Sequence, residues 1–148
     1  MPDDAPPPLC MDDWPDPADA ALDPFEGFLQ DLARAADVCL KPHRHALRFS
    51  GEAPATVGDC SDCALLVEAR TPDGERQPAH DLELEIYRSG PELNLMLSRV
   101  DDAMAPILWH GHHPVWMVAS TGERCERPRD GAPLEAFCRR IRALLVAA

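Results

Sequence analysis

The sequence is poor in basic and in aromatic residues. Its 148 residues include 14 Lys or Arg against 26 Asp or Glu, which gives a formal net charge of −12, and Lys41 is the only lysine. Proteins bind nucleic acids and anionic lipids through basic side chains, so this balance argues against both as partners. A protein with a basic surface is the kind of partner that such a chain attracts.

Long hydrophobic runs are absent as well. No uncharged apolar run reaches the roughly 18 residues of a membrane-spanning helix. The residues from Met1 to Asp4 contain no basic stretch leading into an apolar one, so we expect no signal peptide and a cytoplasmic location. In that reducing compartment the six cysteines are expected to be thiols or metal ligands instead of disulfides.

Motifs of known enzymes are also missing. No Ser or Cys stands in a familiar nucleophile context, and no glycine-rich phosphate-binding loop is present. Glu83 and Glu85 are two residues apart in an expected strand, a spacing typical of the solvated side of a sheet. The sequence therefore favours a protein without enzymatic activity.

The composition divides the chain into a tail and one domain. Seven Asp and seven Pro, but no Lys or Arg, lie between Met1 and Pro24, so residues 1–22 are predicted to be a disordered acidic tail. Within it, the apolar and acidic segment from Leu9 to Trp14 is a candidate docking peptide; the alternative is a solvated tail. Residues 23–148, in a chain with 45% hydrophobic residues, are predicted to form a single domain.

Hydrophobic periodicity predicts the elements of this domain. Residues 82–87 and 93–98 alternate apolar with polar side chains around Ser89-Gly90-Pro91, as in a half-buried antiparallel hairpin. Residues 107–109 and 115–118 form a second expected pair, which extends the hairpin to a meander. The other expected elements are a helix over 24–40, strands over 43–49 and 63–69, and a helix from 133 to 145. The predicted fold class is α+β, with an antiparallel meander of about five to six strands packed against an N-terminal and a C-terminal helix.

This arrangement, together with the acidic charge, resembles the small acidic chaperones and assembly factors of bacteria, in which a curved antiparallel sheet lies beside one or two helices. The resemblance covers architecture and charge alone, and the middle helix that interrupts the strands of secretion chaperones is not expected here. Negative charge without basic patches and the lack of a nucleophile or phosphate loop favour a cytoplasmic accessory or adaptor protein. If the helices cover one face of the sheet, aromatic and Met side chains on the other face suit a protein interface. The candidate partner-binding residues are Tyr87, Met96, Trp109, Trp116 and, in the tail, Trp14. The alternative is that both sheet tryptophans complete the core.

A metal site is the second hypothesis. Cys60-Ser61-Asp62-Cys63 has the C-x-x-C spacing that places two thiolates on one tetrahedral zinc. His110 and His112 are candidates for the remaining ligands, with His113 or the pair His43 and His45 as alternatives. A redox dithiol would require a helix after the motif, whereas the next residues are typical of a strand. Two ordinary thiols beside a strand are the simplest interpretation. A third hypothesis is a small-ligand-binding domain with a pocket between sheet and helix.

Overall fold

The computed structural model describes residues 24–51 and 62–147, so the predicted tail, with Trp14, and Cys60 lie outside the described residues. The elements in chain order are α2 (Pro24–Cys39), β1 (Arg44–Phe49), β2 (Asp62–Arg70), the 3₁₀ helix η2 (Pro78–His80), β3 (Leu82–Ser89), β4 (Glu92–Arg99), β5 (Ile107–His110), β6 (Pro114–Met117), β7 (Arg124–Cys125) and α3 (Gly131–Ala147). Within these residues no helix has the length and apolar character needed to cross a membrane.

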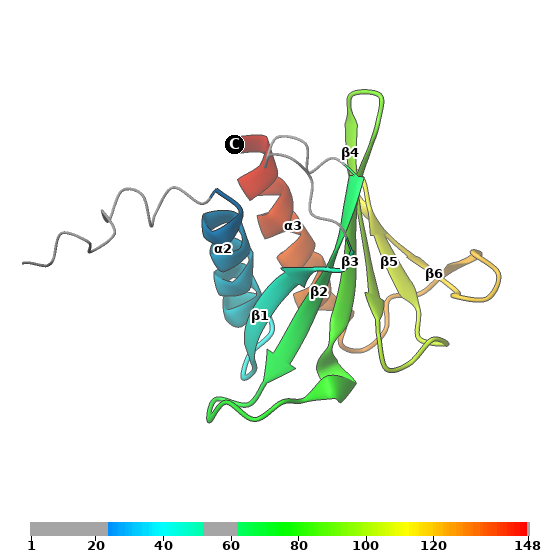
Figure 1. Ribbon diagram of the computed structural model, residues 1–148. Helices are drawn as coiled ribbons and strands as arrows, with labels where there is room; N and C mark the ends of the chain where they lie inside the picture. Colours follow the sequence, from blue (N-terminus) through cyan, green and yellow to red (C-terminus); the bar gives the residue numbers. More distant parts are fainter. Residues whose placement is uncertain (1–23, 52–61, 148) are drawn as a thin grey trace, which may run out of the picture.

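The seven strands form one antiparallel sheet in which each strand pairs with the next along the chain. Both helices lie on the same face of this sheet (Figure 1). The predicted α+β meander between two helices is therefore confirmed. The sheet is one strand longer than expected, because β7 has two residues inside a polar run and pairs only with Trp116 and Met117 of β6.

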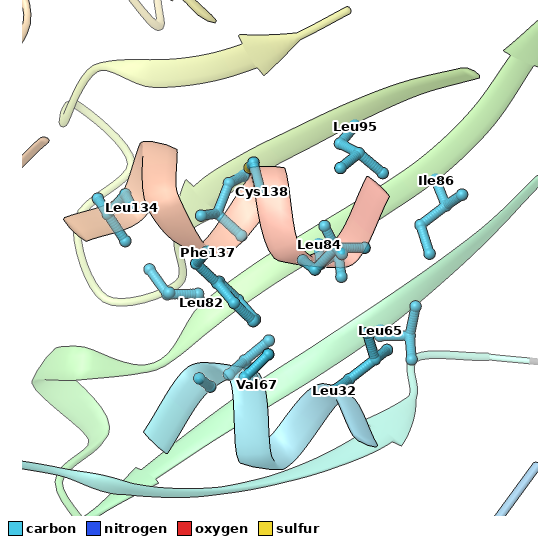
Figure 2. Packing of buried hydrophobic residues seen from close by; sticks show 14 of the residues in the cluster. Leu32, Leu65, Val67, Leu82, Leu84, Ile86, Leu95, Leu134, Phe137 and Cys138 are labelled. Carbon is cyan, nitrogen blue, oxygen red and sulfur yellow. The ribbon is translucent and has the colours of Figure 1, made fainter. Parts of the chain in front are cut away.

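The hydrophobic core fills the space between the sheet and the two helices. Figure 2 shows Leu65, Leu84 and Leu95 from three strands together with Leu32 of α2 and Phe137 of α3. All five side chains are fully buried. Since burial of each such side chain contributes about 1.5–3 kcal/mol, this layer is the main source of stability for the fold.

Trp116 belongs to this core, and its expected place on the open face is wrong. The register pairs Trp116 with the buried Leu108, so both side chains face the helices, and Trp116 is 5% exposed. Its indole Nε1 donates a hydrogen bond to Oε2 of Glu135 in α3 at 2.7 Å. A Cβ at Gly131 would lie 2.9 Å from the indole ring. The ring therefore links β6 to the first turns of α3 at a position where only glycine leaves room for it.

The connection between β2 and β3 is held by a buried carboxylate. Asp81 is 5% exposed and accepts hydrogen bonds from Nη1 and Nη2 of Arg76, at 3.0 and 2.7 Å, and from the Ala69 amide at 2.8 Å. Burial alone would raise the pKa of Asp81, but the Arg76 guanidinium and the Ala69 N–H together hold this pKa below its ordinary value. The carboxylate thus stabilises the folded chain only in its ionised form.

Replacement of this carboxylate tests its contribution to stability. Asp81→Asn is expected to lower the free energy of unfolding by about 2 kcal/mol at pH 7, since charge-assisted hydrogen bonds are lost. Because the folded-state pKa is depressed, the stabilisation is present above about pH 4 and is lost as the pH falls through the folded-state value. The difference between wild type and variant should therefore shrink at pH 3, as measured by urea unfolding.

The matched control is Asp73→Asn, the same substitution at an exposed turn residue of the same connection. It is expected to leave unfolding unchanged at both pH values. An Asp81→Asn variant as stable as the wild type at pH 7 would contradict the assignment.

Candidate functional site

The face of the sheet opposite the helices carries a continuous apolar surface on four neighbouring strands. The register places Met96 beside Trp109, Trp109 beside Val115, and Ile107 beside Met117. Tyr87 of β3 lies on the same face, because it alternates with the buried Ile86. We call this surface the open-face strip: Tyr87, Met96, Ile107, Trp109, Val115 and Met117. All six side chains are half-buried, and no described helix covers them (Figure 1).

The indole of Trp109 has a defined orientation within the strip. Its Nε1 donates a hydrogen bond to the Tyr87 hydroxyl at 2.8 Å, so the two aromatic groups meet across the intervening strand β4. A Cβ at Gly111 would lie 3.2 Å from the indole ring and 3.2 Å from Oδ1 of Asn94. Asn94 is 6% exposed. The ring is thus held between Tyr87, Gly111 and the buried amide of Asn94.

Negative charge without a described counter-ion borders the strip on one side. Glu85 of β3 pairs directly with Met96, and Glu83 and Asp62 lie on the same face of β3 and β2. None of these three carboxylates forms an ion pair with another described residue. By contrast, Glu68, further along this face, is 3.2 Å from Arg48 and 3.9 Å from Arg70. The apolar strip therefore adjoins carboxylates that are available to a basic group from outside.

The structure brings together three of the five residues predicted to contact a partner. Tyr87, Met96 and Trp109 belong to the strip, whereas Trp116 is in the core and Trp14 lies outside the described residues. The prediction missed Ile107, Val115 and Met117. Their alternation with buried positions was the available signal, but the strands that carry them have only four residues each.

The predicted metal ligands that the structure describes, Cys63, His110 and His112, are not gathered at one point. Cys63 pairs with Ile86, Ile86 with Leu95, and Leu95 with His110, so Cys63 and His110 lie in one row of the sheet. Three strand spacings separate them by about 14 Å, which is too far for two ligands of one zinc ion. No group of three or more His, Cys, Asp or Glu residues suited to a metal occurs in the described part of the chain.

The two predicted histidine ligands also differ from each other in environment. His112 is exposed and its Nε2 is 2.5 Å from Oε1 of Glu92. His110 faces the helices and is 3% exposed; its Nδ1 lies 3.1 Å from the Gly111 carbonyl oxygen, and its Nε2 has no hydrogen-bond partner among the described residues. Burial, aided by the positive charges of Arg142 and Arg139, lowers the pKa of His110. This imidazole is therefore neutral near pH 7.

The hydrogen bond between Trp109 and Tyr87 can be measured with a double-mutant cycle. Tyr87→Phe removes the acceptor and Trp109→Phe removes the donor, while both keep an aromatic ring in place. Urea unfolding of the two single variants and the double variant is expected to give a coupling energy of about 0.5–1.5 kcal/mol. A coupling energy of zero would show that the two rings do not restrain each other.

Comparison with known proteins identifies a family but no activity. Searches of curated proteins and of solved structures give no match to this chain. A family described as "Domain of unknown function (DUF8659)" matches residues 29–144, which extend from the first turns of α2 into the last turn of α3. The match includes every strand of the sheet and covers well over half of the sequence, and on this basis the chain belongs to the DUF8659 family.

Proposed function

We propose that this protein is a non-enzymatic accessory protein that binds a partner protein through the open-face strip. One observation carries the proposal: six half-buried apolar side chains are contiguous on a sheet face that no described helix covers. An antiparallel sheet that meets only water on its outer face normally carries polar side chains there. Strand β3 follows that rule with Glu83 and Glu85, whereas β5 and β6 do not.

The charges beside the strip define the chemistry of the partner. Interface cores are enriched in Trp, Tyr and Met and are surrounded by a polar rim. Here Trp109, Met96 and Tyr87 supply such a core, and Glu83 and Glu85 supply an acidic rim. The complementary surface is an aliphatic or aromatic patch flanked by Lys or Arg. The net charge of −12 adds long-range attraction, which salt weakens.

A second copy of the chain complements this surface less well. It carries the same carboxylates beside the same strip, so a face-to-face pair would bring like charges together. We therefore assign the surface to a different protein.

Photo-crosslinking at two methionines tests the location of the contact. A photoreactive amino acid replaces Met96 in the strip or, as the control, Met104, which is 71% exposed in the connection from β4 to β5. Adducts with one partner are expected from position 96 and not from position 104, and their yield should fall as salt rises. The partner in the adduct is identified by mass spectrometry and then used in purified form.

Charge reversal tests the chemistry of the contact with that purified partner. The double variant Glu83→Lys, Glu85→Lys is expected to weaken binding about tenfold or more. The control Asp73→Lys, Glu75→Lys makes the same change in net charge at exposed residues of the β2–η2 connection and should preserve affinity. Equal weakening by both variants, or adducts formed only between two copies of this chain, would reject the proposal.

A further inference from the structure

A separate pocket lies on the side of the sheet that bears the helices. It occupies the end where α2 finishes and α3 begins, which is the lower end of both helices in Figure 1. Its volume is about 320 Å³. That volume is at the lower end of the roughly 300–1,000 Å³ typical of small-molecule sites. The open-face strip is on the opposite face of the sheet, so the two surfaces are independent of each other.

Most of the pocket wall is apolar. Leu40 and Pro42 line it from the connection after α2, Leu82 from the start of β3, and Pro133 and Leu134 from the first turns of α3. Leu82 and Leu134 are also members of the core, so this part of the wall is rigid. An occupant therefore needs an apolar body.

The remaining wall is rich in nitrogen bases, unlike the rest of this acidic chain. Lys41, Arg99 and the three histidines His43, His45 and His80 all line the pocket. The rings of His43 and His80 are 4.2 Å apart between centroids, and those of His43 and His45 are 6.5 Å apart. Five basic groups thus meet at one small volume in a protein whose net charge is −12.

Two of these five groups already have acidic partners. Asp130, which is the only carboxylate among the residues that line the pocket, forms an ion pair with Arg99. Nδ1 of His45 is 3.0 Å from Oδ1 of Asp37, a residue of α2. Lys41, His43 and His80 have no carboxylate partner among the described residues. These three are the groups available to an anion.

The surroundings of His43 in this pocket disfavour its protonated form. Burial lowers the pKa of His43, and the neighbouring His80 and His45 lower it further. A bound negative charge would offset this repulsion and raise the pKa again. Anion binding and proton uptake are therefore coupled, and affinity should rise as the pH falls.

We propose that this pocket binds a small organic carboxylate, with the carboxylate held by Lys41, His43 and His80 and the hydrocarbon body packed against Leu82 and Leu134. A carboxylate suits this pocket because Lys41 supplies one permanent positive charge without a described carboxylate partner, and the imidazoles of His43 and His80 line the same volume. The apolar walls favour such a molecule over inorganic phosphate, which has no apolar part.

The probe for the test is sodium benzoate, added to the full chain with isotope-labelled histidines. We expect saturable NMR shifts of the His43 and His80 rings and a higher pKa of His43 in the bound state. If benzoate raises this pKa by about one unit, binding should be about threefold to sixfold tighter at pH 6 than at pH 8. Asp37, Asp130, His45, Lys41 and Arg99 are the other charged groups that face or adjoin these two rings, and the ion pair between Arg99 and Asp130 should persist over that range.

The variant Lys41→Gln, His80→Gln is expected to weaken benzoate binding about tenfold or more, and both side chains are exposed enough for the fold to tolerate the change. Arg34→Gln is the control, because it removes a positive charge from the surface of α2 outside this pocket. Unchanged affinity in the double variant, or equal weakening by Arg34→Gln, would overturn the proposal. Inorganic phosphate binding as tightly as benzoate would overturn the assignment to organic carboxylates, and so would Zn²⁺ shifting the same rings at lower concentration.

Discussion

The structure depends on the packing of α2 and α3 against the same face of the seven-stranded sheet. Because strand side chains alternate, each strand sends every second residue under the helices and the others to the opposite side. Leu84 and Leu95 are fully buried for this reason, while their neighbours Glu85 and Met96 remain accessible. The alternation of side chains along the strands therefore produces both the core on one face and the open-face strip on the other.

Two polar contacts fasten the ends of this arrangement. Asp81 joins the β2–β3 connection through Arg76, and Trp116 joins β6 to α3 through Glu135. Both contacts bury a carboxylate, which is costly unless every hydrogen-bond partner is in place. The contact of Trp116 with Glu135 restricts how β6 can shift beneath α3. For the proposed contact with a partner protein, a sheet held in this way would offer the open-face strip as a preformed surface, which would lower the entropic cost of binding.

The sequence predicted the helices and strands better than it predicted which residues lie close together. The paired runs at 82–87 and 93–98 were long enough for their alternation to identify a hairpin, whereas β7 is too short to produce any periodic signal. The proposed ligands Cys63 and His110 looked compatible because each is a good zinc ligand, yet the meander places two strands between them. The residue types suggested zinc binding, but the order of the strands keeps these two side chains too far apart to share one ion.

The sequence by itself determined the period of each segment, and with it the fold class, because hydrophobic spacing is a local property of the chain. Only the tertiary structure decided which side of the sheet the helices cover. Trp109 and Trp116 have the same residue type and comparable strand contexts, but the register turns one outward and the other inward. The ring contact between His43 and His80 could not be predicted from the sequence either, since contacts between distant segments depend on tertiary packing and not on the spacing of residues along the chain.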